Sequence, residues 1–129
     1  MLRIMTLADG VKSSLDNGRG EKIKLVDERL GTTAIDLHHN TLHPGGPNGR
    51  YHRHTKSDNV YIVMSGTGDL VADGKTHTVT KGQIIFIPAG MPHGLNNPHS
   101  EPFEIFEIYA PAGPEFDFTI VEADKADRD

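Results

Sequence analysis

The chain has 129 residues, 36 % hydrophobic and 24 % charged, with a formal net charge of −5 and no cysteine. This length fits one domain with a core, and the lack of cysteine excludes disulfides, thiolate metal ligands and a cysteine nucleophile. The negative charge and the absence of a lysine or arginine cluster argue against nucleic acid as a partner. No segment has the pattern of a signal peptide or the length of a membrane span, so we expect a cytoplasmic protein without a membrane partner.

Short β-prone segments follow one another along the chain, separated by turns rich in its 14 glycines and eight prolines. The predicted strands and hairpin cover residues 21–26, 32–39, 59–65, 69–79, 83–88, 103–110 and 115–121. Within 69–79, Asp73-Gly74 is a dipeptide that favours a two-residue hairpin turn. Short strands at this spacing predict an all-β sandwich or barrel with little helix.

No internal repeat or linker divides the chain, so we predict a single domain over residues 1–129. Its core is expected at about residues 32–121, after an N-terminal arm at 1–31. The polar residues 122–129 are expected to fray, as chain ends commonly do.

Three histidines are the candidate metal ligands. His52 and His54 are two residues apart, so on a strand they point to the same face. His93 follows a sharply bent loop in the stretch IPAGMPHGLNN. Three neutral imidazoles suit Fe²⁺, Mn²⁺, Ni²⁺, Zn²⁺ or Cu²⁺ and do not suit Ca²⁺ or Mg²⁺. A lone pair of histidines is also common as surface decoration, so the pair by itself leaves the site open.

The other five histidines are interpreted as structural or solvated. His38 and His39 are adjacent, so at most one of them faces the interior of a strand, and a structural role is expected. His43, His77 and His99 lie in a loop, a hairpin arm and a turn, where we expect solvent contact.

The spacing of the candidate ligands resembles the two signature motifs of the cupin superfamily. The first motif, G-x5-H-x-H-x3–4-E-x6-G, is matched by Gly46, His52, His54 and Gly66. The second motif, G-x5-P-x-G-x2-H-x3-N, is matched by Gly82, Pro88, Gly90, His93 and Asn97. The resemblance implies a small single-domain cupin, folded as a β-barrel or double-stranded jelly roll. It also implies one divalent transition metal ion per chain, held by His52, His54 and His93.

The sequence departs from the first motif at its glutamate. Asn59 has the required spacing to Gly66, whereas Asp58 fits only the shorter spacing after His54. A shift of one residue turns a side chain to the other face, so we place Asn59 at the site and Asp58 in the turn. Asn59 is then a weak amide ligand of the metal or a substrate contact; the alternative is an amide that closes the turn. Without the glutamate the centre keeps a charge near about +2 and attracts anionic, bidentate ligands.

Strand alternation adds three residues to the predicted pocket. Arg50, two residues before His52, is a candidate to bind a substrate carboxylate, or else a rim charge in solvent. Tyr61, two residues after Asn59, is the candidate catalytic residue, as a general base, or else ordinary core packing. Phe106 is a candidate wall residue and substrate contact on the segment 103–110.

The resemblance implies a protein that acts on a small organic metabolite, anionic or chelating through oxygen. Cupins include dioxygenases, isomerases, cyclases and lyases, and the fold does not choose among them. We favour an enzyme; the alternatives are a non-catalytic module that binds or senses a metal-chelating ligand, and a purely structural cupin. By analogy with cupin barrels that pair edge strands between subunits, we also expect a homodimer.

Overall fold

The computed structural model of the protein describes residues 1–112 and 118–121. In these residues the chain forms eleven β-strands and three short 3₁₀ helices, so the all-β prediction with little helix is confirmed. The strands are β1 (Val11–Ser14), β2 (Gly20–Val26), β3 (Asp36–Leu42), β4 (His52–His54), β5 (Asp58–Ser65), β6 (Thr67–Ala72), β7 (Lys75–Thr80), β8 (Ile84–Ile87), β9 (His93–Asn96), β10 (Phe103–Ala110) and β11 (Phe118–Ile120). The 3₁₀ helices are η1 (Leu7–Asp9), η2 (Asp16–Gly18) and η3 (Glu28–Leu30).

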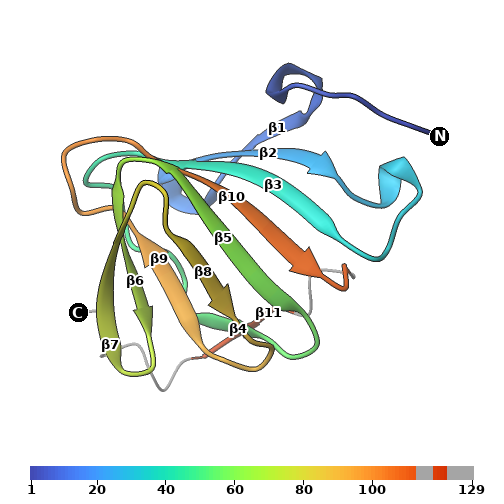
Figure 1. The fold of residues 1–129 in the computed structure, drawn as a ribbon. Helices are drawn as coiled ribbons and strands as arrows, with labels where there is room; N and C mark the ends of the chain where they lie inside the picture. The colour runs from blue at the N-terminus through green and yellow to red at the C-terminus, as the bar shows by residue number, and fades with distance from the viewer. Residues whose placement is uncertain (113–117, 122–129) are drawn as a thin grey trace.

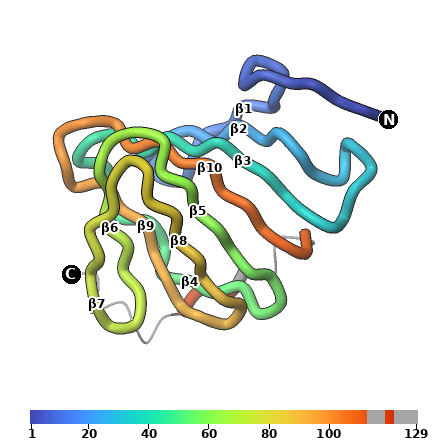
Figure 2. The backbone as a smooth tube through the Cα atoms, in the orientation of Figure 1, coloured from blue at the N-terminus to red at the C-terminus, as the bar shows by residue number. Residues whose placement is uncertain are grey.

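The strands form two antiparallel sheets, shown in Figure 1. The larger sheet has the order β1-β2-β3-β10-β5-β8, and the smaller has the order β11-β4-β9-β6-β7. Neighbours such as β3 and β10 are far apart in the sequence but lie side by side, as the backbone trace in Figure 2 shows. This interleaving of distant strands is the jelly-roll arrangement that the sequence predicted.

Local chemistry explains where two of the predicted elements begin and turn. The hairpin of β6 and β7 turns at Asp73 and Gly74, whose φ angles of 55° and 70° suit a type I′ turn, so this prediction is confirmed. The strand predicted from residue 32 begins only at Asp36. Thr32 accepts a hydrogen bond from the Ala34 N–H through its hydroxyl, at 3.1 Å, and such a local bond competes with a strand ladder.

The core lies between the two sheets. Along β5 and β10, buried residues alternate with more exposed ones. Buried apolar side chains from both sheets form one cluster, namely Leu42, Tyr61, Val63, Leu70, Ala72, Val79, Ile87, Leu95, Phe103 and Ile105. On β8, Ile87 is buried in this cluster, whereas Ile84 and Phe86 face outward with exposed fractions of 70 % and 61 %.

The segment predicted as an N-terminal arm, residues 1–31, contains two strands of the larger sheet. β1 and β2 extend the larger sheet beyond β3, and Lys22 of β2 lies opposite Asn40 of β3. Residues 115–117 of the last predicted strand and the predicted frayed tail 122–129 lie outside the described residues. None of the helices in the described residues is long and apolar enough to span a membrane.

Candidate metal centre

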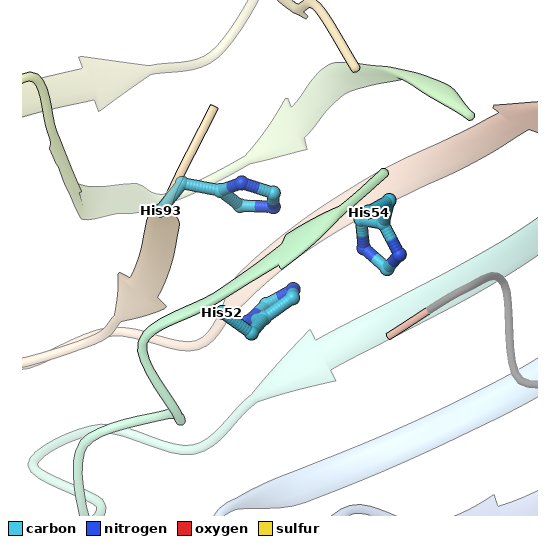
Figure 3. Close-up of side chains that lie close together, drawn as sticks. All are labelled: His52, His54 and His93. Atoms are coloured by element: carbon cyan, nitrogen blue, oxygen red, sulfur yellow. The ribbon is translucent and has the colours of Figure 1, made fainter. Parts of the chain in front are cut away.

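Three histidines from adjacent strands of the smaller sheet meet inside the fold. His52 and His54 are the first and last residues of the short strand β4. His93 is the first residue of β9 and lies directly opposite His52. Their ligand nitrogen atoms all lie within 4.8 Å of one another. Figure 3 shows the three rings gathered between the strands. The sequence spacing predicted this meeting, and the structure brings all three residues together.

The loop before β9 is tied directly to the strand that carries the other two histidines. The Gly90 N–H donates a hydrogen bond to the carbonyl oxygen of His54 at 2.7 Å. The Met91 N–H donates to the Pro88 carbonyl at 3.2 Å, which closes the turn. Gly90 has a φ of 87°, a left-handed conformation that glycine adopts without strain. The second motif therefore positions His93 through its backbone.

Backbone carbonyls set the tautomer of two of these rings. Nδ1 of His52 lies 2.7 Å from the Arg50 oxygen, and Nδ1 of His93 lies 2.9 Å from the Met91 oxygen. Because a carbonyl can only accept, each Nδ1 carries the proton and each Nε2 presents a lone pair. The Nε2 of His93 is buried and has no hydrogen-bond partner among the described residues. This arrangement fits a transition metal, whose imidazole ligands are usually oriented through their second nitrogen.

The environment keeps these imidazoles neutral. Burial, with a smaller contribution from His93, lowers the pKa of His52 to about 2, against the raising effect of the hydrogen bond to the Arg50 carbonyl. Burial also lowers the pKa of His93. Neutral rings are the form that binds a metal ion, so the site is ready for one at neutral pH.

Asn59 and Asp58 face opposite ways, as alternation predicted. Asp58 is exposed, and its carboxylate accepts a hydrogen bond from the Ala89 N–H at 3.0 Å. Asn59 is buried, and its Nδ2 donates to the Ile108 carbonyl at 2.9 Å. Its Oδ1 is also buried and accepts no hydrogen bond from the described residues. The amide is therefore held by β10 and leaves its oxygen available inside the fold.

A pocket opens beside the histidines between the two sheets. His52 and His54 line it, together with the apolar side chains Leu15, Leu42 and Leu95. Three cations, Arg19, Lys22 and Arg50, also line it, which makes its rim basic.

One carboxylate links the two arginines of this rim. Asp16 accepts from Arg19 Nε through Oδ1 and pairs with Arg50 Nε through Oδ2, both at 3.2 Å. Arg50 therefore lines the pocket as the sequence predicted, although its side chain is 56 % exposed.

The structure places Tyr61 in the pocket and Phe106 outside it. Tyr61 is buried and lines the pocket from β5. Burial, with the nearby charge of Glu107, raises the pKa of Tyr61 well above its usual value, so its hydroxyl is a proton donor at neutral pH. Phe106, expected as a wall residue, lies on the opposite face of β10, with its ring 5.2 Å from that of His39. That placement was wrong because Ile105 and Glu107, one residue to either side of Phe106, are the buried, inward-facing residues of β10.

Three polar residues that line the pocket were not predicted from the sequence. Asn40, Glu107 and Tyr109 line it from β3 and β10. A signal for Glu107 existed, since it falls in phase with Phe103 and Ile105 on a segment whose other face was taken as the wall. Arg19 and Lys22 lie before both motifs, in a region where no pattern connected them to the site.

Two of the remaining histidines lie against acidic side chains. His38 is fully buried with its Nε2 against an Asp36 carboxylate oxygen, which agrees with the structural role expected for it. His99 Nε2 lies 2.8 Å from an Asp69 carboxylate oxygen, so it is paired rather than only solvated. Within the part of the chain that the structure describes, no other group of three or more potential ligands forms a cluster.

Comparison with known proteins identifies related sequences and folds. Residues 38–109 match the family model described as Cupin domain. Mannose-1-phosphate guanylyltransferase from Klebsiella pneumoniae is 32 % identical over 82 residues, which cover 64 % of this chain and 17 % of that enzyme. The chain thus spans under one fifth of the length of this guanylyltransferase and of its counterpart from Escherichia coli.

Two further proteins are similar over most of the chain. An uncharacterized protein from Methanocaldococcus jannaschii is 30 % identical over 114 residues, which cover 79 % of this chain and 91 % of that protein. The polyketide cyclase RemF from Streptomyces resistomycificus superposes with a TM-score of 0.80 over 94 % of this chain and 86 % of its own. The identity to the cyclase is 23 %, so this likeness shows the fold alone.

The lowered pKa of His52 predicts that the metal-free protein loses stability in acid. The unfolded chain binds a proton at this histidine below a pKa of about 6.5, whereas the folded chain excludes it down to about 2. Stability is therefore complete above about pH 6.5 and falls as the pH decreases below it. Between pH 7.5 and 5.5, the unfolding free energy in urea should fall by about 1 kcal/mol more in the wild type than in His52→Asn. Equal losses in the two proteins would contradict this assignment.

Proposed function

The chain belongs to the cupin family, and on this premise we propose that it binds one divalent transition metal ion through His52, His54 and His93 and acts on a small anionic metabolite. The observation that carries the proposal is the convergence of three imidazoles, with the Nε2 of His93 buried and unpartnered, beside a pocket with a basic rim. We infer a ligand that chelates the ion through oxygen, with Asn59 as a fourth, amide ligand or a substrate contact.

The residues around the centre have distinct tasks in this proposal. When bound, the ion supplies a Lewis acid with coordination positions open to ligand oxygens. The carbonyls of Arg50 and Met91 orient the rings of His52 and His93. The cations of the rim attract an anionic ligand and orient its charged group. Tyr61 keeps its hydroxyl proton at neutral pH, so it contributes by hydrogen bonding inside the pocket and does not act as a base.

The basic rim supports an anionic ligand independently of the metal. Arg19 and Arg50 share Asp16, whereas Lys22 reaches the pocket from β2. The similarity to part of a guanylyltransferase named for a sugar phosphate also favours a small anion such as a phosphorylated or carboxylated metabolite. The likeness to a cyclase is compatible with the isomerase, cyclase and lyase reactions that cupins include, and a dioxygenase reaction fits the same donor set.

Binding without turnover is the alternative function. A binder or sensor would hold the same ligands but would neither consume oxygen nor exchange carbon-bound protons. The metal-loaded protein with a panel of hydroxy acids and diketones separates these cases. Oxygen uptake indicates a dioxygenase, deuterium incorporation from D₂O indicates proton transfer at carbon, and saturable binding with neither indicates a binding module.

Removing a ligand should remove the metal. After loading with excess Zn²⁺ and gel filtration, the wild type should retain about one ion per chain, and His52→Ala and His93→Ala far less, because two imidazoles hold the ion weakly. Elemental analysis of the purified proteins measures the content. His77→Ala removes an imidazole from the hairpin arm of β7 and should leave the content unchanged. A wild type that holds no metal after loading would refute the proposed function.

Lys22 should contribute to binding of an anion at the metal-loaded site. Oxalate is a suitable probe because it carries two carboxylates and chelates through oxygen. Replacing Lys22 by Gln should weaken oxalate binding by roughly tenfold, the size of one charge-assisted contact of about 1.5 kcal/mol. Calorimetry measures the change, and Lys75→Gln on the distant β7 is the control. An unchanged affinity in Lys22→Gln would remove Lys22 from the ligand site.

We also propose that the protein forms a homodimer through the β8 edge of the larger sheet. β8 is an edge strand whose outer side chains Ile84 and Phe86 are largely exposed, and such an apolar edge favours pairing with a second copy. Light scattering should give the mass of two chains for the wild type and of one chain for Phe86→Glu. Val11→Glu, on the opposite edge strand, should remain dimeric. A monomeric wild type would contradict the proposal.

The cytoplasmic location expected from the sequence stays a prediction.

A further inference from the structure

The donor set of the candidate metal centre is neutral throughout. Imidazoles bind a metal ion in their neutral form, and the position where the first motif has a glutamate is occupied by Asn59. The Asn59 amide is itself held by the Ile108 carbonyl, at 2.9 Å. A divalent ion moved from water into such a site loses hydration without meeting an opposite charge, and this weakens binding.

A buried carboxylate nevertheless lies in the same pocket. Glu107 of β10 lines it together with His52 and His54 and is 6 % exposed. Along the paired strands, Glu107 lies opposite Tyr61, and Tyr109 lies opposite Asn59. Glu107 therefore comes from the strand next to β5, one inward-facing pair away from the position of the missing glutamate.

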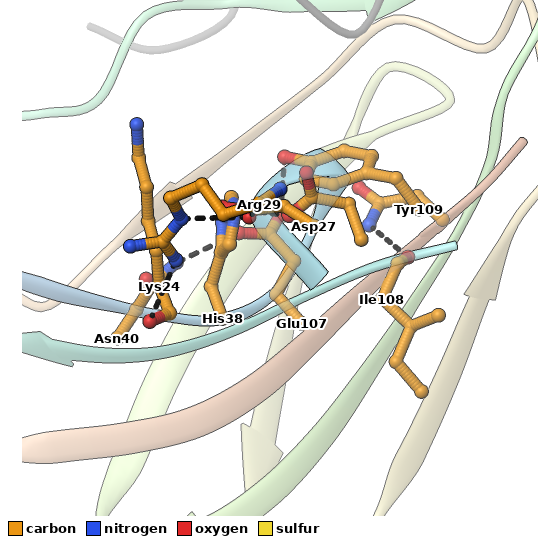
Figure 4. Close-up of polar contacts among 10 residues, drawn as sticks. Lys24, Asp27, Arg29, His38, Asn40, Glu107, Ile108 and Tyr109 are labelled. Atoms are coloured by element: carbon orange, nitrogen blue, oxygen red, sulfur yellow. Dashed lines mark hydrogen bonds and ion pairs between the residues drawn. The ribbon is translucent and has the colours of Figure 1, made fainter. Parts of the chain in front are cut away.

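Three neutral donors hold this carboxylate in place. Its Oε1 accepts from Asn40 Nδ2 at 2.7 Å, and its Oε2 accepts from the Tyr109 hydroxyl at 2.6 Å, as Figure 4 shows. The Tyr61 hydroxyl is also hydrogen-bonded to Glu107. Burial raises the pKa of Tyr109, as it does that of Tyr61, so both hydroxyls keep the proton that they donate. These contacts fix the position of the carboxylate, and none of the three donors brings a positive charge to it.

The same tyrosines connect the carboxylate to the histidines. The ring of Tyr109 lies 4.7 Å from that of His54, and the ring of Tyr61 lies 6.3 Å from that of His93, measured between centroids. Tyr109 donates its hydroxyl proton to Glu107 while its ring contacts that of His54, so one side chain connects the carboxylate to the ligand cluster.

We propose that Glu107 supplies from β10 the negative charge that the glutamate of the first motif would supply from β5, and so raises the affinity of the centre for a divalent ion. This inference rests on the proposed function, because it requires an ion at the three histidines. A carboxylate fixed in advance by hydrogen bonds needs no rearrangement when the cation arrives, which is why groups outside the ligand set strongly affect metal affinity. The competing interpretation is a purely structural one, in which Glu107 only links β3 to β10 through Asn40.

The dissociation constant for Zn²⁺, measured by competition with a chelating dye, tests the proposal. Glu107→Gln keeps the size of the side chain and removes its charge, and it should bind Zn²⁺ roughly 10–100-fold more weakly than the wild type. The control is Glu104→Gln, which makes the same charge change on the other face of β10 and should bind as the wild type does. An unchanged constant in Glu107→Gln, or an equal loss in Glu104→Gln, would overturn the proposal.

A charge swap distinguishes electrostatic compensation from a structural role. Adding Asn59→Glu to Glu107→Gln returns a carboxylate to the motif position and should recover roughly tenfold of the lost affinity. A purely structural role predicts the same gain in affinity from Asn59→Glu in the wild type and in Glu107→Gln, whereas charge compensation predicts a larger gain in Glu107→Gln, which lacks the other carboxylate. No recovery in the double variant, or an equal gain in the two backgrounds, would therefore refute the charge assignment.

Circular dichroism shows whether Glu107→Gln folds as the wild type does. If it does not, a second pair of variants tests the proposal. Glu107→Asp and Glu107→Asn have side chains of equal size that differ in charge, and the aspartate variant should bind Zn²⁺ roughly tenfold more tightly. Equal constants in this pair would reject the proposal. A wild type that binds no Zn²⁺ is a different outcome, since it refutes the metal site itself, whereas a binding wild type with an indifferent Glu107 refutes only this inference.

Discussion

The pairing of β4 with β9 is the contact on which the candidate site depends. It sets His52 opposite His93, and the hydrogen bond from Gly90 to the His54 carbonyl ties the loop before β9 to the same short strand. β4 has only three residues, so these few backbone contacts hold two of the three imidazoles. Because the rings are also oriented by carbonyls through Nδ1, the geometry of the centre is built mostly from main-chain interactions.

The larger sheet supplies the chemistry that the smaller sheet lacks. Its inward face carries the carboxylate of Glu107, the hydroxyls of Tyr61 and Tyr109 and the amides of Asn40 and Asn59. Burying so many polar groups costs stability unless each is hydrogen-bonded, and most of these atoms are. The apolar cluster that includes Val63, Phe103 and Ile105 lies further along the same strands. Each of these strands thus combines a packed, apolar half that holds the sheets together with a polar half that faces the pocket.

Membership of the cupin family narrows the chemistry without choosing a reaction. The three histidines keep the family pattern, while the carboxylate expected beside them is replaced by an amide. In the structure a buried carboxylate, Glu107, lines the pocket from a neighbouring strand, and two of the cations at the rim, Arg19 and Lys22, come from residues before either motif. Several side chains that face the pocket therefore lie outside the two motifs.

The sequence by itself determined the all-β class, most strand positions, the turn at Asp73-Gly74 and the three histidines, because these depend on local spacing and alternation. Alternation also separated inward Asn59 from outward Asp58. It did not decide which face of β10 is the inner one, so Phe106 was preferred although Glu107 lines the pocket. That choice depends on how β10 packs between β3 and β5, and the approach of Arg19 and Lys22 depends on β2 joining the same sheet. Such contacts join segments far apart in the chain, and only the tertiary structure decides them.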